Sequence, residues 1–153
     1  MFSPGSSQII IQLVLAVLLG GLIGLEREFK KKEAGLQTYS LVTLGSCVFT
    51  IISFKLFYFF LATTNVSFDP SRVIQAVAVG IGFLGAGVIF RQSSGTVGLT
   101  TAAGLWVSAS VGIAVGAEFY FLAVAGTFLT LLVLVGFGLV EQKTFKKKET
   151  DRD

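Results

Sequence analysis

Apolar residues fill five long stretches of the chain, and polar residues gather in the short segments between them. The stretches cover approximately residues 9–25, 36–62, 73–90, 99–117 and 119–140. A transmembrane helix needs about 20 mostly apolar residues, with a range of about 17 to 25. The pattern therefore predicts an all-α membrane protein, a bundle of about five transmembrane helices. The junction of the last two stretches is a turn of only Gly116, Ala117 and Glu118, which predicts an antiparallel hairpin.

The composition supports this class. Of the 153 residues, 53% are hydrophobic and 14% are charged, whereas soluble domains carry about 25% charged residues. The sequence has no histidine, and Cys47 is its single cysteine. These counts exclude an intrachain disulfide and a zinc site built from cysteine and histidine. Residues 1–8 contain no lysine or arginine, so we expect the first stretch to be retained rather than cleaved as a signal peptide.

Basic residues lie at the ends of alternate stretches, and their placement predicts an orientation. Ten of the twelve lysines and arginines fall on one side when the five stretches are threaded across a membrane. The positive-inside rule then places the N-terminus outside and the C-terminus in the cytoplasm. We expect residues 1–141 to form the transmembrane domain and residues 142–153 a charged cytoplasmic tail. Since these charges cluster at segment ends, they indicate membrane lipid rather than nucleic acid as their partner. The ten are Arg27, Lys30, Lys31, Lys32, Arg91, Lys143, Lys146, Lys147, Lys148 and Arg152.

Small residues recur every four positions inside three of the stretches. Lipid tails are as apolar as leucine, so membrane helices associate where small residues let two backbones approach. The spacing places each set on one helix face and predicts that the first, third and fourth stretches form the packed centre. We interpret these residues as packing positions rather than ligand sites. The strongest candidates are Gly20 and Gly24, Gly82, and Gly104, Ser108 and Gly112.

Polar side chains at the ends of the stretches are the candidate functional groups. Asp69 and Arg72 open the third stretch on the outer side. Asp69 is placed to cap that helix, and a contact with an external ligand or partner is the sharper hypothesis. The other candidates lie on the inner side, where they could converge into a polar vestibule with Glu26 paired to Arg91, or could each act as an interfacial anchor. They are Glu26, Arg27, Arg91, Thr100 and Thr101.

No motif in the sequence indicates catalysis. The glycines of Gly80–Gly85 match the dinucleotide-binding pattern, but that pattern belongs at a strand-to-helix turn with an acidic residue about 20 positions later. Here the glycines lie in an apolar stretch, and no acidic residue occurs between Asp69 and Glu118. The sequence contains no phosphate-binding loop, nucleophile–base pair or metal-ligand cluster. We therefore expect no enzymatic activity and no cofactor.

The chain resembles the MgtC/SapB family of bacterial inner-membrane proteins. Two long and specific blocks carry this resemblance, GIGFLGAGVIFR at Gly80–Arg91 and GLTTAAGLWV at Gly98–Val107. Three shorter blocks precede them in order, namely GGLIGLERE at Gly20–Glu28, AGLQT at Ala34–Thr38 and DPSR at Asp69–Arg72. The match covers nearly all of the hydrophobic region. At these positions the resemblance carries over Glu26, Arg27, Asp69, Arg72, Arg91, Thr100 and Thr101 as candidate functional residues.

The resemblance implies a five-helix membrane domain linked to adaptation to low magnesium and, in pathogens, to survival inside host cells. Family members look like modulators rather than ATPases, and inhibition of the F-type ATP synthase is one proposed action. This chain departs from the family where an arginine and a threonine–histidine pair are common, because it has Gln37, Thr38 and Tyr39. Better-known members also carry a soluble C-terminal domain, whose functions are not carried over.

Two functions therefore remain as hypotheses. The first is a non-enzymatic modulator, linked to magnesium limitation and membrane energetics, that binds a membrane partner; the resemblance suggests the ATP synthase, and homo-oligomers stay open. The alternative is a transporter or channel component for magnesium or another ion. The expected location is a bacterial inner membrane. A plastid membrane is the alternative, because the 15 phenylalanines and many lysines and isoleucines would suit an AT-rich genome.

Overall fold

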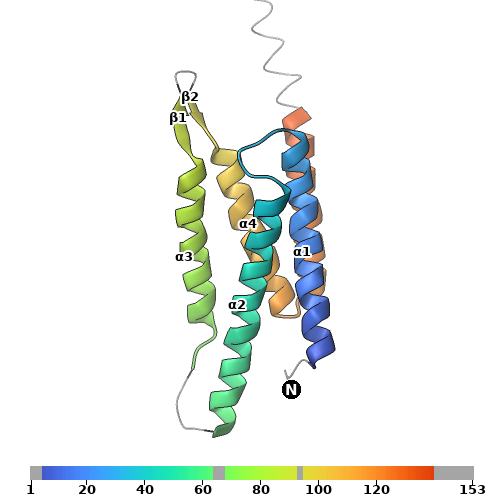
Figure 1. Cartoon of the computed structure of the whole chain (residues 1–153), viewed down its shortest axis with the longest axis vertical. Helices are drawn as coiled ribbons and strands as arrows, with labels where there is room; N and C mark the ends of the chain where they lie inside the picture. The colour runs from blue at the N-terminus through green and yellow to red at the C-terminus, as the bar shows by residue number, and fades with distance from the viewer. Residues whose placement is uncertain (1–4, 64–67, 93–94, 140–153) are drawn as a thin grey trace, which may run out of the picture.

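The protein is an all-α bundle, described by a computed structural model over residues 5–63, 68–92 and 95–139 (Figure 1). Within these residues five helices are long and apolar enough to cross a membrane, which confirms the predicted class. The first four are α1 (Ser6–Phe29), α2 (Leu36–Thr63), α3 (Ser71–Val88) and α4 (Leu99–Gly116). The fifth is α5 (Tyr120–Leu132), continued by the π-helical turn η1 (Val133–Phe137). The expected cytoplasmic tail, residues 142–153, lies outside the described residues.

A short β-hairpin, which the sequence reading missed, joins α3 to α4. Strands β1 (Phe90–Gln92) and β2 (Gly95–Val97) pair antiparallel, with Arg91 opposite Thr96. The third apolar stretch therefore leaves the helix at Val88 rather than at residue 90. Gly98 follows with φ +89°, and a Cβ there would collide with the carbonyl oxygen of Val88. Only glycine adopts this left-handed conformation without strain, so it permits the tight turn into α4.

The packed centre of the bundle is formed by α1, α2 and α4. Gly24 of α1 lies against the start of α2, where a Cβ would be 2.8 Å from the Cα of Leu36. Gly20 likewise faces Thr43 of α2, and Gly112 of α4 comes against Thr43 and Ser46. Gly104 of α4 contacts the ring of Tyr39. In each case the missing side chain lets two helices approach closely, as expected of small residues in membrane proteins. The placement of the first and fourth stretches at the centre was therefore correct.

The placement of the third stretch at the centre was wrong within this chain. Ile81 and Gly85 are the only buried residues of α3, and a Cβ on Gly82 would meet no atom within 4 Å. The helix leans on α4 with one narrow face, where Gly85 comes close to Ala102. Spacing of small residues shows that they share a face but not which way that face points. The place expected for α3 is taken by α2.

The buried face of α2 is polar, a feature that the sequence reading also missed. Its buried residues include Tyr39, Thr43, Ser46, Thr50 and Ser53. Thr43 Oγ1 lies 2.6 Å from Ser108 Oγ of α4, and Thr43 also donates to the carbonyl oxygen of Tyr39 at 2.9 Å. Such hydroxyls satisfy each other and nearby carbonyls, so they stabilise helix contacts inside lipid. Their spacing of three and four residues was a signal available in the sequence.

The two ends of the bundle differ in charge. We call the end where α1, α3 and α5 finish and α2 and α4 begin the basic end (Figure 1). The opposite end holds the start of α1 and the turn between α4 and α5, where Gln8 Nε2 donates to Glu118 Oε1 at 2.6 Å. That turn confirms the hairpin predicted for the last two stretches. The orientation of these ends across a membrane stays a prediction.

Candidate functional site

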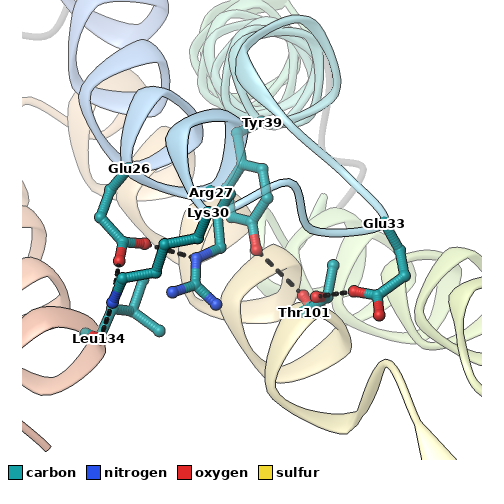
Figure 2. Close-up of polar contacts among 7 residues, drawn as sticks. All are labelled: Glu26, Arg27, Lys30, Glu33, Tyr39, Thr101 and Leu134. Atoms are coloured by element: carbon teal, nitrogen blue, oxygen red, sulfur yellow. Dashed lines mark hydrogen bonds and ion pairs between the residues drawn. The ribbon is translucent and has the colours of Figure 1, made fainter. Parts of the chain in front are cut away.

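Three charged residues at the end of α1 form an ion-pair cluster. Arg27 Nε donates to Glu26 Oε2 at 2.5 Å, and Lys30 Nζ lies 2.7 Å from Glu26 Oε1 (Figure 2). The side chains of Arg27 and Glu26 are only 3% and 11% exposed. Lys30 follows Glu26 by four residues, so both project from the same helix face. One carboxylate is therefore held between two cations at the basic end.

Lys30 also connects this cluster to the last helix. Its Nζ donates to the carbonyl oxygen of Leu134 at 2.9 Å. Leu134 belongs to η1, where the wider π-helical turn alters the regular backbone hydrogen bonding of α5. Lys30 therefore holds the ends of α1 and α5 together.

A second group of contacts links the α1–α2 loop to the first turn of α4. Tyr39, which is fully buried, donates its hydroxyl to the carbonyl oxygen of Thr101 at 3.1 Å. The Thr101 hydroxyl donates to Glu33 Oε2 at 2.5 Å. Tyr39 stands in the segment where this chain departs from the family pattern, and nothing in the sequence reading assigned it a role. The tyrosine joins α2 to α4 beside Arg27 (Figure 2).

The α1–α2 loop is closed by Glu28. Its Oε2 accepts the backbone N–H of Leu36 at 3.1 Å, and Leu36 is the first residue of α2. A carboxylate at a helix N-terminus satisfies a free donor and complements the helix dipole. The acidic motif that ends α1 is thus divided between two tasks, with Glu26 in the ion-pair cluster and Glu28 at the start of α2.

The predicted inner-side residues come together only in part. Glu26, Arg27 and Thr101 share the cluster drawn in Figure 2. Of the two alternatives left open, the pairing of Glu26 with Arg91 is not the one found, since Glu26 pairs with Arg27 and Lys30. Arg91 is exposed on the hairpin that projects beyond the helices, and Thr100 is exposed as well. The hairpin, invisible in the apolar pattern, carries Arg91 away from the end of α1.

Asp69 and Arg72 lie near the opposite end of the bundle, before and within the first turn of α3. Asp69 Oδ1 accepts the backbone N–H of Ser71 at 2.9 Å. Hydrogen bonds from Ser71 lower the pKa of the Asp69 carboxyl below its usual value. Ser53 of α2 donates to the carbonyl oxygen of Pro70 at 3.1 Å and so anchors this turn. This geometry is that of a carboxylate capping the start of α3. Asp69 and Arg72 are both exposed.

The described residues contain no group of three or more histidine, cysteine, aspartate or glutamate side chains that could hold a metal ion.

We expect Glu33 to stabilise the folded protein in a pH-dependent way. The hydrogen bond from Thr101 is the main cause that lowers the pKa of Glu33 in the folded protein. A carboxyl with a lowered pKa stabilises the fold above its unfolded-state pKa, and that contribution disappears as the pH falls through the folded-state value. We expect Glu33→Gln to lower the melting temperature in detergent at neutral pH, with a difference from the unmodified chain that shrinks below about pH 4. Thr101→Val should give the same pH dependence. A difference in melting temperature between variant and unmodified chain that stays constant with pH would contradict this prediction.

These features define a class: an integral membrane protein of five helices, with a polar cluster at one end of a tightly packed three-helix centre. The chain matches the model of the MgtC family over residues 13–143, and it belongs to that family.

Bacterial relatives support this assignment. The putative magnesium transporter YhiD of Escherichia coli K12 is 43% identical over 141 residues, which cover 92% of this chain and 64% of that protein. Protein SapB of Bacillus subtilis is 42% identical over 130 residues, covering 84% of this chain and 56% of SapB. Protein MgtC of Brucella abortus strain 2308 is 45% identical over 102 residues, or 67% and 40% of the two chains. The chain thus spans less than two thirds of these relatives. Their names describe no enzyme, and no solved structure matches significantly.

Proposed function

We propose that this protein is a non-enzymatic modulator that binds another integral membrane protein through the exposed face of α3. The carrying observation is that α3 packs against the rest of the chain through one narrow face and leaves most of its surface exposed. Val79 and Phe83 are 77% and 82% exposed, and Cβ atoms on Gly80, Gly82 and Gly87 would meet no atom within 4 Å. In α1 and α4, by contrast, Gly20, Gly24, Gly104 and Gly112 make close contacts with α2. A glycine-rich face left open on a membrane helix is suited to the same kind of contact with a second protein.

The resemblance to the MgtC/SapB family supports a membrane protein as the partner. It implies a modulator linked to magnesium limitation, with the F-type ATP synthase as one proposed target. A helix of such an assembly would offer the apolar surface that α3 requires. The bacterial relatives support a bacterial inner membrane as the location, with the basic end facing the cytoplasm by the positive-inside rule.

Site-specific photocrosslinking tests this proposal. A photoreactive residue in place of Phe83 is expected to form a defined adduct with one membrane protein in cells, whereas the same residue in place of Phe121 of α5, which is 89% exposed, labels lipid alone. Gly82→Leu should abolish the adduct, because leucine fills the open face. Gly45→Leu on α2 is the matched control, since a Cβ at Gly45 also meets no atom within 4 Å.

Three results would count against partner binding through α3. Adducts with lipid only, from both positions, would remove its support. An adduct with a second copy of the chain would make the face a homo-oligomer contact. An adduct that persists in Gly82→Leu would place the contact elsewhere.

The alternative function is ion transport, as the name of the E. coli relative describes for that protein. Polar side chains inside the bundle favour it, because polar residues within transmembrane segments often mark ion paths. Gln12 is fully buried, donates to the carbonyl oxygen of Val115 at 3.3 Å, and leaves its Oε1 without a partner among the described residues. The test is magnesium flux into proteoliposomes that contain the protein. Flux that Gln12→Leu abolishes would favour ion transport over the modulator function.

A further inference from the structure

Arg27 is enclosed at the basic end yet uses only part of its hydrogen-bonding capacity. A guanidinium group carries five N–H donors in a rigid fork. In Arg27 the Nε donor goes to Glu26. No hydrogen bond joins the two terminal amino groups to any residue in the described part of the chain (Figure 2). Neither nitrogen is among the fully enclosed atoms without a partner, so each keeps some exposed surface. A charged side chain that is 3% exposed thus presents four donors to a group that the chain itself does not supply.

The surrounding charges favour an anion as that group. Within the described residues, Glu26 is the one carboxylate paired with both Arg27 and Lys30, which leaves this trio with one net positive charge. The next acidic residues, Glu28 and Glu33, are both exposed. Each is already engaged, Glu28 by the backbone N–H of Leu36 and Glu33 by the hydroxyl of Thr101. Because Glu26 is shared between two cations, the buried charge of Arg27 is only partly compensated, which is costly. An anion beside Arg27 would remove that cost.

The N-terminus of α4 adds to the same field. The helix begins at Leu99 with no side-chain hydrogen bond at its cap residue, Gly98, and with no acidic residue in its first turn. Its free backbone N–H groups and dipole favour negative charge nearby, part of which the Glu33 carboxylate at Thr101 supplies. Thr101 of this first turn is joined by hydrogen bonds to Tyr39 and Glu33 of the same cluster (Figure 2). The helix end and the enclosed guanidinium are independent features that point to the same kind of ligand.

We propose that the terminal amino groups of Arg27, together with Lys30, bind one oxyanion of the phosphate type at the basic end. The forked donors match two phosphate oxygens, and this planar match is what distinguishes arginine from lysine at such sites. Lys30 has a third ammonium proton free after its contacts with Glu26 and Leu134. The phosphate comes either from a lipid headgroup, since the cluster lies at the ends of five membrane-length helices, or from solution. This site does not depend on partner binding through α3.

Binding by the full-length chain, purified in neutral detergent without phosphate, tests the site in two arms. In the first, inorganic phosphate is titrated against chloride at equal ionic strength, with the melting temperature as the readout. In the second, native mass spectrometry counts phosphatidylglycerol molecules retained by the protein. We expect retention or stabilisation in at least one arm, and the arm that responds identifies the source of the phosphate. No response in either arm would overturn the proposal.

Matched variants separate this site from general surface charge. Arg27→Gln is expected to weaken binding about tenfold or more, because it removes charge-assisted hydrogen bonds. Lys31→Gln makes the same charge change at an exposed position of the same end and should leave binding nearly unchanged. If Arg27→Gln fails to purify as a folded protein, Arg27→Lys carries the test, because it keeps the charge but loses the fork. Equal weakening in the Arg27 and Lys31 variants would refute a specific site. Gly82→Leu should bind phosphate normally even where it abolishes the α3 adduct.

Discussion

Gly112→Val is expected to destabilise the bundle severely. A Cβ at this position would collide with the carbonyl oxygen of Thr43 and would lie 2.9 Å from the Cβ of Ser46. Because both atoms belong to or lie next to the α2 backbone, the two helices would have to separate. Overpacking in a well-packed interior costs about 1 to 3 kcal/mol, occasionally more, and this contact involves backbone. We expect the variant to lose at least about 3 kcal/mol of stability or to fail to accumulate.

The measurement is unfolding in detergent micelles, followed by circular dichroism. Gly82→Val is the control, because it makes the same change in α3, where a Cβ meets no atom within 4 Å. It should unfold at nearly the same temperature as the unmodified chain. Similar losses in both variants would mean that helix propensity, rather than the α2–α4 contact, sets the effect.

Glu26→Gln should produce the second large effect. The Glu26 carboxylate is paired with both Arg27 and Lys30. Its removal leaves the buried Arg27 without an ion-pair partner among the described residues. Loss of one member of a buried ion pair costs about 3 to 5 kcal/mol. We expect a loss near the lower end of that range, because Lys30 is partly exposed. Chemical unfolding in mixed micelles would measure it.

Two further variants define the cause of this loss. Glu28→Gln makes the same change two residues along α1, at an exposed position with one hydrogen bond to Leu36, and should cost less than about 1 kcal/mol. Adding Arg27→Gln to Glu26→Gln should restore part of the stability, since the uncompensated charge is then gone. If the double variant is less stable than Glu26→Gln alone, the ion pair is not the source of the effect.

The contrast between Gly112 and Gly82 shows where sequence reasoning ended. Both glycines lie in apolar stretches and in four-residue repeats of small residues, and the sequence treats them alike. In the folded chain Gly112 is pressed against α2, whereas Gly82 faces away from the protein. In soluble proteins the hydrophobic face would have distinguished them. In a membrane both the lipid side and the protein side are apolar, so hydrophobicity does not mark the inside.

The candidate site was likewise predicted only in part. The charges at the end of α1 could be placed together because they are close in sequence. Their long-range partners could not be placed, since the Lys30 contact with Leu134 joins residues 104 apart. The role of Tyr39 could not be predicted, because a tyrosine at the start of an apolar stretch has many ordinary roles. Its contact with Thr101, 62 residues away, gives it a position in the cluster.

The sequence by itself determined the membrane class, the five helices, the hairpin of α4 with α5, and the family. These properties depend on local composition, on the length of apolar stretches and on motifs, all of which can be read along the chain. Only the tertiary structure decided that α2 rather than α3 occupies the centre and that Glu26 pairs with Lys30 rather than Arg91. It also decided that Arg27 is buried with N–H donors that make no hydrogen bond within the described residues. Those outcomes depend on which faces meet and how side chains are directed. Helix packing fixes both in three dimensions.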